Sequence, residues 1–433
     1  MKYAVVTFGC RVNQADSIGF EEQLLAAGAT ATSPDAADLV VVNTCSVTAT
    51  ADQGARQTIR RIARDNPHAR IVVTGCYATR RPDELTSLPN VARVVHNDDK
   101  PRLLPLLSGS ALSAFSASSA PTEGGPCGAP IEPGVMGRTA FTLRVQTGCA
   151  EPCSYCIIPS TRGAPRSVPV AEVLGEIDRV VSVGFKEIAL TGVHLGSYGR
   201  DLAPRSSLIA LLNSIERANP PARSAIRSGE RNATLFRISS LEPMDCSRDI
   251  VELVASTPSF APHFHLPLQH ASDRLLAAMR RPYTIRYYAD LVDDVRARIP
   301  DAAIGADVIV GFPGETDADF EELVRYLEGS PLSHVHVFPY SDRPGTIAST
   351  LGGRPPGAAV RERAGRVREI GQRLVQRFRD AQIGTTHRAL TLEDGSLVVT
   401  GNYLKLRIPP GGARNEWVSV RVASHDHGEL LAG

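Results

Sequence analysis

The sequence has almost no net charge and no long apolar run. Its 47 Lys and Arg residues nearly balance its 46 Asp and Glu residues, so the formal net charge is +1. This balance excludes a protein that binds polyanions through its overall charge, and any nucleic-acid contact must come from local basic clusters. The N-terminal residues 1–10 turn polar after an apolar run too short for a signal sequence or a membrane span. We therefore expect a cytoplasmic protein with no membrane segment.

The sequence also lacks a fourth ligand beside its densest group of cysteines. Cys149, Cys153 and Cys156 follow the spacing C-x3-C-x2-C, and residues 157–163 contain neither Cys nor His. A zinc site would need a fourth Cys or His nearby, and a two-cluster ferredoxin would continue toward a Cys-Pro pair. Three thiolates can hold three irons of a [4Fe–4S] cube, which leaves the fourth iron open to a small molecule. The spacing favours such a cluster, with zinc as the alternative.

Cysteine content and length set two further bounds. Eight cysteines in a chain that stays in the cytosol favour metal or redox chemistry over disulfide bonds. Six of the eight form two sets of three, whereas Cys127 and Cys246 receive no role. The length of 433 residues suggests about three domains at roughly 150 residues each.

The first 100 residues predict a parallel sheet with covering helices. Three short β-branched runs alternate with polar stretches compatible with helices, and each run is followed by a cysteine. The cysteines are Cys10, Cys45 and Cys76, separated by 35 and 31 residues. Because parallel strands end at one edge of a sheet, the three thiols should meet there. A second cluster with an open iron is one interpretation, and three buried structural cysteines are the other.

Residues 138–340 predict a partial barrel of six βα units, open on one side. The predicted strands cover residues 141–145, 187–190, 235–239, 263–266, 304–310 and 334–338. The predicted helices cover residues 170–183, 207–218, 248–256, 272–298 and 317–328. In such barrels the loops at the carboxyl ends of the strands carry the chemistry, and the C-x3-C-x2-C segment follows the first strand. The spacing of His263, His265 and His270 suggests a metal, but we expect ordinary histidines at the barrel rim and in a loop.

Basic residues cluster in two helical segments. Residues 49–70 carry five arginines on a predicted helix, where a phosphate contact and a solvated flank are the two interpretations. Residues 341–384 hold a helix with seven arginines, from Arg361 to Arg379, against three acidic residues. Residues 386–422 alternate short apolar and polar runs, which predicts a small OB-like barrel, a common nucleic-acid platform. Residues 103–137 are rich in Ser, Ala, Gly and Pro and predict a linker.

The order of these features resembles the radical S-adenosylmethionine methylthiotransferase family over nearly the whole chain. Residues 148–159, with Arg162-Gly163 and Arg166-Ser167 after them, resemble its core signature, as do residues 307–316 and 339–346. The resemblance implies an α/β chain with three folded parts and one linker. These are an N-terminal doubly wound parallel-sheet domain (1–102), the linker (103–137), a six-unit partial βα barrel (138–380) and a TRAM-like OB barrel (381–433).

The same resemblance implies two [4Fe–4S] clusters and S-adenosylmethionine as cofactors. The set Cys149, Cys153 and Cys156 would hold the cluster that cleaves S-adenosylmethionine to a carbon radical. The set Cys10, Cys45 and Cys76 would hold a second cluster, whose open iron carries the sulfur. The implied contacts to S-adenosylmethionine are Tyr155, Thr191, Gly192, Ser240, Glu242 and Gly311. Radical chemistry is needed because no general base at neutral pH can remove the aromatic hydrogen at adenine C2.

Branches of the family differ in substrate: isopentenylated adenosine in tRNA, threonylcarbamoylated adenosine in tRNA, or an aspartate of a ribosomal protein. Residues 46–61 resemble the threonylcarbamoyladenosine branch, whereas Gln269-His270 resembles the ribosomal-protein branch. We expect methylthiolation of N6-threonylcarbamoyladenosine beside the anticodon, with the tRNA anticodon loop, an electron donor and a sulfur donor as partners. A non-catalytic RNA-binding module with structural metal sites is the alternative from another class. Structural sites are normally closed by four ligands, whereas both sets here stop at three.

Overall fold

The computed structural model describes residues 1–108, 132–133, 139–219, 234–426 and 429–432. Most of the predicted linker, with Cys127, lies outside these residues. The chain divides into two compact units. The N-terminal unit comprises Met1–Ile131, Thr147–Glu151 and Cys156–Ala164, and the C-terminal unit comprises Glu132–Gln146, Pro152–Tyr155 and Pro165–Gly433. Two segments of the C-x3-C-x2-C region therefore fold with the N-terminal unit.

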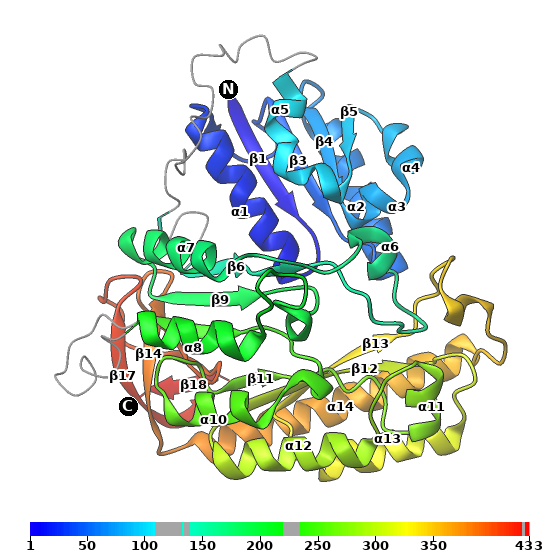
Figure 1. Cartoon of the computed structure of the whole chain (residues 1–433), viewed down its shortest axis with the longest axis vertical. Helices are drawn as coiled ribbons and strands as arrows, with labels where there is room; N and C mark the ends of the chain where they lie inside the picture. Colours follow the sequence, from blue (N-terminus) through cyan, green and yellow to red (C-terminus); the bar gives the residue numbers. More distant parts are fainter. Residues whose placement is uncertain (109–131, 134–138, 220–233, 427–428, 433) are drawn as a thin grey trace. The chain divides into compact units, whose positions relative to one another are not determined.

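The N-terminal unit contains a five-stranded parallel sheet in the order β2-β1-β3-β4-β5 (Figure 1). Its strands are β1 (Lys2–Thr7), β2 (Thr30–Ala31), β3 (Leu39–Thr44), β4 (Arg70–Gly75) and β5 (Val91–Val95). Its helices are α1 (Arg11–Ala26), α2 (Ala49–Asp65), α3 (Cys76–Arg80), α4 (Pro82–Thr86), η1 (Asn97–Arg102), α5 (Leu103–Ser108) and α6 (Ile158–Arg162). The predicted parallel sheet is confirmed, and β2 and β5 are additional strands at its two edges.

Both faces of this sheet are covered by helices. Val42 of β3 packs with Ile59 of α2 in one hydrophobic cluster. The preceding residue, Val41, packs with Leu24 of α1 in a second cluster. Since successive side chains of a strand point to opposite faces, both faces of β3 need apolar residues. This double burial explains why the central strands are continuous apolar runs and not alternating ones.

The C-terminal unit contains the six predicted strands as two parallel sheets, β10-β9-β6 and β11-β12-β13. The strands are β6 (Ala140–Arg144), β9 (Glu187–Thr191), β10 (Leu235–Ile238), β11 (His263–His265), β12 (Ala303–Val310) and β13 (His334–Pro339). The helices between and after them are α7 (Val170–Ser182), α8 (Leu208–Ala218), α10 (Arg248–Ser256), α11 (Asp273–Ala278), α12 (Ile285–Arg298), α13 (Asp317–Gly329) and α14 (Gly357–Gln382). The predicted succession of six βα units is confirmed.

The single helix predicted over residues 272–298 is wrong, because the segment is broken into α11 and α12. Pro282 has no backbone N–H to continue a helix, and Arg280 adopts a left-handed φ of 58° after α11. Thr284 then begins α12, where its hydroxyl accepts a hydrogen bond from Tyr287 N at 3.3 Å. The break leaves Arg281 in a loop instead of on a helix face.

The last strands close into a barrel in the order β14-β15-β16-β18-β17. They are β14 (Thr386–Leu392), β15 (Leu397–Thr400), β16 (Lys405–Arg407), β17 (Trp417–Asp426) and β18 (Glu429–Ala432). The predicted small barrel is confirmed, with β18 as an unpredicted strand that pairs with both β16 and β17 and completes the closure. Leu406, Val420 and Leu430 contribute to its interior.

Helix α14 is amphipathic over its 26 residues. It buries Val367, Ile370 and Leu374 on one face and exposes arginines on the other. Within the described ranges, no helix combines the length and the apolar character that crossing a membrane requires.

Candidate functional site

The carboxyl edge of the N-terminal sheet carries Cys10, Cys45 and Cys76. Strands β3 and β4 end in register, so Cys45 and Cys76 leave neighbouring strands at the same level. A Cβ added at Gly9 would lie 2.5 Å from Cys45 Cβ and 2.7 Å from its Sγ. Gly9 also has a φ of +88°, so glycine alone allows the loop before Cys10 to approach Cys45 this closely. The three thiols therefore share one edge of the sheet.

Burial disfavours the charged form of the Cys45 thiol. Cys45 and Cys76 are buried, whereas Cys10 is exposed. Burial, with the nearby Cys76 and Cys10, raises the pKa of Cys45 to about 11, so a metal ion would have to displace its proton. Among the described residues, no group of three His, Cys, Asp or Glu side chains stands at metal-binding geometry. Three thiols without a closing ligand are nevertheless the donor chemistry of an iron–sulfur cube with one open iron.

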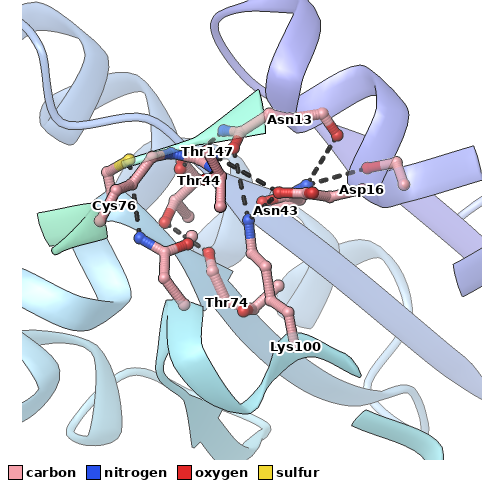
Figure 2. A network of polar contacts seen from close by, with 12 residues as sticks. Asn13, Asp16, Asn43, Thr44, Thr74, Cys76, Lys100 and Thr147 are labelled. Carbon is pink, nitrogen blue, oxygen red and sulfur yellow. Dashed lines mark hydrogen bonds and ion pairs between the residues drawn. The ribbon is translucent and has the colours of Figure 1, made fainter. Parts of the chain in front are cut away.

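Asn13 fixes the loops that carry two of these cysteines (Figure 2). Its Nδ2 donates hydrogen bonds to Phe8 O at 2.8 Å and to Thr44 O at 2.9 Å. Phe8 precedes Cys10 by two residues, and Thr44 directly precedes Cys45. The buried amide thus sets the spacing between the ends of β1 and β3. Sequence analysis missed Asn13, although its position three residues after Cys10 was a usable signal.

Each sulfur atom of the C-x3-C-x2-C motif accepts a hydrogen bond. In the N-terminal unit, the backbone N–H two residues after Cys149 lies 3.4 Å from Cys149 Sγ, and the N–H two residues after Cys156 lies 3.5 Å from Cys156 Sγ. In the C-terminal unit, Arg281 Nη1 lies 3.3 Å from Cys153 Sγ. Such hydrogen bonds stabilise thiolates and tune bound clusters. Each of the three sulfurs therefore lies in surroundings that suit a ligand of an iron–sulfur cluster.

Arg281 links several residues predicted to surround S-adenosylmethionine. Its side chain is 2% exposed, and its guanidinium forms an ion pair with Glu242. Burial alone lowers the pKa of Arg281, but Glu242, Tyr155 and Cys153 outweigh this effect, so the group stays charged. The structure thus brings Tyr155, Glu242 and Cys153 to one buried cation. Sequence analysis missed Arg281 because it placed the residue on a continuous helix.

Close packing accounts for the glycines at positions 192 and 311. A Cβ at Gly192 would lie 3.0 Å from Gln146 Oε1, and the preceding Thr191 is buried. Gly311 has a φ of +79°, and its N–H donates to Glu315 Oε2 at 2.7 Å. A Cβ at Gly311 would also lie 2.6 Å from a side chain of α14. A contact of these loops with S-adenosylmethionine stays a prediction.

Ser240 belongs to a chain of polar contacts across β11 and β12. Ser240 Oγ lies 2.7 Å from His265 Nδ1, and His265 Nε2 lies 3.0 Å from Asp307 Oδ1. The ring of His334 in β13 lies 6.4 Å from that of His265, and burial lowers the pKa of His334 to about 4. A neutral His334 therefore neighbours the His265–Asp307 pair.

His263 is the first residue of β11 and is buried at 8% exposure. His270 follows Gln269 in a loop as predicted, but it is completely buried, and its Nδ1 accepts a hydrogen bond from Ser272 N at 3.0 Å. Gln269 has a left-handed φ of 68°, and its N–H donates to Asp307 O at 2.8 Å. Packing and backbone pairing therefore account for the Gln269-His270 pair.

Several of the seven arginines of α14 pair with other groups of the protein. Their partners are Glu315 and Asp317 for Arg363, Glu321 for Arg366, Glu328 for Arg373 and Ser330 O for Arg377. Most of these partners belong to α13 or its N-terminal loop, so the surface is less basic than the sequence indicates. Arg361 and Arg368 are exposed and form no ion pair with the described residues.

Two family models match the chain. Residues 2–96, which contain the N-terminal sheet, match the uncharacterized protein family UPF0004. Residues 143–327, which contain most of the six-strand region, match the radical SAM superfamily.

Individual proteins match over greater lengths. The Threonylcarbamoyladenosine tRNA methylthiotransferase MtaB of Aquifex aeolicus is 35% identical over 94% of this chain and 96% of its own. The tRNA-2-methylthio-N(6)-dimethylallyladenosine synthase of Clavibacter sepedonicus is 34% identical over 95% of this chain and 78% of its own. Among solved structures, the radical S-adenosylmethionine methyltransferase TsrM from Kitasatospora setae shares the fold, with a TM-score of 0.55, 17% identity and coverage of 80% of this chain and 77% of that one. By these matches, the chain belongs to the radical S-adenosylmethionine methylthiotransferase family.

Proposed function

We propose that this enzyme replaces the C2 hydrogen of N6-threonylcarbamoyladenosine, beside the anticodon of tRNA, with a methylthio group. The proposal rests on two separate sets of three cysteines in a chain that matches MtaB-named relatives over nearly its full length. Three thiolates leave one iron of a cube open. One open iron would bind S-adenosylmethionine, and the other would bind the sulfur to be inserted.

The two donor sets would hold two [4Fe–4S] clusters. The proposal assigns the first cluster to Cys149, Cys153 and Cys156, and the second to Cys10, Cys45 and Cys76. When bound, the first cluster with S-adenosylmethionine supplies a carbon radical that can break an aromatic C–H bond. The chain contributes the hydrogen bonds to the cysteine sulfurs, which favour the thiolate form.

The residues around Arg281 would bind and orient S-adenosylmethionine. The buried guanidinium holds the Glu242 carboxylate in one position, and a fixed carboxylate is a strong acceptor for ribose hydroxyls. Tyr155 packs against a hydrophobic cluster that includes Leu275 of α11 and Phe312 after β12, and it lies on the segment that carries Cys153. The complete predicted contact set is Tyr155, Thr191, Gly192, Ser240, Glu242 and Gly311.

The modified base requires a site apart from the phosphate contacts. Arginine contacts to phosphates give affinity but carry little sequence information, so the unstacked base itself must be recognised. A groove of about 640 Å³ lies between β13 and α14 and is lined by His336, Phe338 and Arg368, among others. It combines an exposed aromatic ring with a cation. This combination suits a base stacked on a ring and a threonylcarbamoyl carboxylate paired with a cation.

The alternative substrates have less support. The Gln269-His270 pair is the feature shared with the ribosomal-protein branch, and it is accounted for by burial and backbone pairing. An isopentenyl group is apolar and would leave Arg368 without a partner in the groove. The relative from Clavibacter sepedonicus, named for dimethylallyladenosine, keeps this substrate as the second candidate.

Nucleoside mass spectrometry of tRNA tests the proposal. A strain that lacks the gene should lose 2-methylthio-N6-threonylcarbamoyladenosine and accumulate its unmethylthiolated precursor. Wild-type protein should restore the nucleoside, and the Cys45→Ala variant at equal abundance should not. If the nucleoside persists while an isopentenylated methylthio nucleoside or a ribosomal methylthio-aspartate is lost, the substrate assignment is wrong.

The proposal has further requirements. It needs a one-electron donor and a sulfur donor, and it implies a cytoplasmic location, where tRNA is modified. Anaerobic iron and sulfide analysis separates it from a non-catalytic RNA-binding module, which would hold about one zinc ion and no sulfide. The division into parts at 1–102, 103–137, 138–380 and 381–433 stays a prediction.

A further inference from the structure

A buried asparagine lies against the third cysteine of the N-terminal set. Asn97 begins η1 and is 9% exposed. Its Nδ2 donates a hydrogen bond to Thr161 O at 2.7 Å. The same Nδ2 lies 3.8 Å from Cys76 Sγ, which is within hydrogen-bonding range for the larger sulfur atom. One amide group of the N-terminal unit therefore contacts both α6, which begins two residues after Cys156, and a predicted cluster ligand.

The hydrogen-bond partners fix the orientation of the Asn97 amide. A backbone carbonyl only accepts hydrogen bonds, so the NH2 group and not the oxygen must face Thr161 O. The oxygen, Asn97 Oδ1, is buried and has no hydrogen-bond partner within the part of the chain that the structure describes. The NH2 group has two hydrogens, so the second is available to Cys76 Sγ. The side chain therefore presents a donor, and not an acceptor, to the sulfur.

The backbone of Asn97 is tied to the helix that begins at Cys76. Asn97 N donates to Thr79 Oγ1 at 2.9 Å, and Thr79 Oγ1 donates to Gly75 O at 3.0 Å. Thr79 lies in α3, whose first residue is Cys76. These bonds place Asn97 beside Cys76 through the backbone, independently of the side-chain contact.

A further group of buried contacts fixes α6. Arg162, the last residue of α6, donates to Asn13 Oδ1, and its Nη2 lies 3.4 Å from Asp16 Oδ2. Lys100 Nζ lies 2.6 Å from the same Asp16 Oδ2 and 3.4 Å from Asn13 Oδ1 (Figure 2). These contacts join α6 to α1 and to η1. The carbonyl that accepts the hydrogen bond from Asn97 directly precedes Arg162 and is therefore held at a fixed position.

We propose that Asn97 is a positioning residue for an iron–sulfur cluster on Cys10, Cys45 and Cys76, and that its hydrogen bond to the Cys76 sulfur raises the reduction potential of that cluster. This inference rests on the second cluster of the proposed function. A thiolate accepts a hydrogen bond more strongly than a neutral thiol does. Adding one electron from a one-electron reductant breaks no bond and makes the cluster sulfurs more negative, so the N–H group stabilises the reduced cluster more than the oxidised one. Because α6 orients the amide, the segment that follows Cys156 takes part in setting this potential.

The test isolates this cluster in the full chain. A background variant with Cys149, Cys153 and Cys156 all replaced by alanine is reconstituted anaerobically with iron and sulfide, and its reduction is followed by electron paramagnetic resonance at controlled potentials. In this background, Asn97→Leu keeps a side chain of similar size but has no donor, and it should move the midpoint to more negative potential. We expect about a threefold change in the ratio of reduced to oxidised cluster at fixed potential, which is about 28 mV for one electron at 59 mV per tenfold change.

Two further variants separate the hydrogen bond from packing. Asn97→Ser is the milder change, and it should move the midpoint in the same direction because its shorter side chain cannot hold both contacts. Asn66→Leu is the matched control, since Asn66 is also 9% exposed and its Nδ2 donates to Pro34 O at 3.1 Å and to Ala37 O at 2.8 Å. These carbonyls precede β3 at the amino edge of the sheet, opposite the cysteines. Asn66→Leu should lower stability but leave the midpoint unchanged.

Pulsed electron paramagnetic resonance detects the hydrogen bond directly. With asparagine labelled with heavy nitrogen, the unpaired electron of the reduced background protein should couple to an amide nitrogen, because the N–H···S contact carries spin density from the sulfur. The coupling should be lost in Asn97→Leu and Asn97→Ser and kept in Asn66→Leu. Folded background protein that holds the cluster but shows no coupling to asparagine nitrogen would overturn the inference, even if neither Asn97 variant folds.

The outcomes distinguish this inference from the proposed function. If the background variant binds iron and sulfide but Asn97→Leu and Asn97→Ser leave its midpoint unchanged, or move it to more positive potential, the inference is overturned and the second cluster stands. If correctly folded background protein binds no iron or sulfide, the second cluster is absent and both proposals fall.

Discussion

Replacing Gly75 with alanine should separate Cys45 from Cys76 and destabilise the N-terminal unit. Gly75 has φ +101° and ψ −169°, a region that only glycine occupies readily, and another residue there costs about 1–3 kcal/mol. The added Cβ would lie 2.2 Å from Thr44 O, although ordinary contact begins near 3.4 Å, so the strand ends would separate by about 1.2 Å. This shift would break the 2.6 Å hydrogen bond from Thr44 Oγ1 to Thr74 O, at about 1 kcal/mol.

The expected total is about 2–4 kcal/mol of unfolding free energy, measured by urea denaturation of the metal-free chain. Anaerobic reconstitution should then load less iron and sulfide than the unmodified chain, because two ligands have moved apart. Gly54→Ala is the matched control, since Gly54 lies within α2 and an added Cβ meets nothing within 4 Å. It should leave stability unchanged or raise it by up to about 1 kcal/mol. A Gly75→Ala chain with normal stability and full iron content would refute this reasoning.

Three other perturbations test the site and the fold. Cys153→Ala should abolish S-adenosylmethionine cleavage, whereas Cys45→Ala should retain 5′-deoxyadenosine formation and stop only sulfur insertion; equal loss of both products, by liquid chromatography, would contradict this division. Arg281→Met removes the cation that contacts Cys153 Sγ and should weaken S-adenosylmethionine binding at least tenfold by equilibrium dialysis, whereas Arg281→Lys should lose less. Burial lowers the pKa of His270 and of His334 to about 4, below the ordinary 6.5, so the unfolded chain binds more protons as pH falls through that interval. Each buried histidine should therefore lower the free energy of unfolding by about 2 kcal/mol between neutral pH and pH 5. The His270→Gln variant should show a weaker pH dependence of the urea midpoint. An unaltered pH dependence would show that burial does not hold His270 neutral.

Much of the fold was predictable because apolar runs typical of strands are separated by longer polar stretches typical of helices. Apolar runs followed by cysteines located β1, β3 and β4, because buried parallel strands cannot alternate with polar residues. Short edge strands such as β2 lack enough residues to show a pattern, and β18 acquires its role only by closing the barrel. Pro282 signals the break after α11, but the helical pattern on both sides of it favoured a single helix in the sequence analysis.

The charged side chains were the least predictable part of the site. Lys100 and Asp16 are 84 residues apart, and Arg162 and Asp16 are 146 residues apart, so no local pattern pairs them. Each would be assigned to the surface by residue type alone. For the arginines of α14 the sequence overestimated the exposed positive charge. Their acidic partners, such as Glu321 and Glu328, are brought close by helix packing, which periodicity does not reveal.

Residues Cys156–Ala164 fold with the N-terminal unit, although segments of the C-terminal unit precede them in the sequence. This arrangement limits where the chain can be cut into fragments and which of its parts can be exchanged between genes. A fragment that ends at the predicted linker would retain Lys100 and Asp16 but would lack α6 and its Arg162. Transplanting residues 1–102 onto another barrel would succeed only if that barrel supplied a matching segment after its last cluster cysteine. Residues 1–102 and the C-x3-C-x2-C segment therefore have to be inherited together, although about fifty residues separate them along the chain.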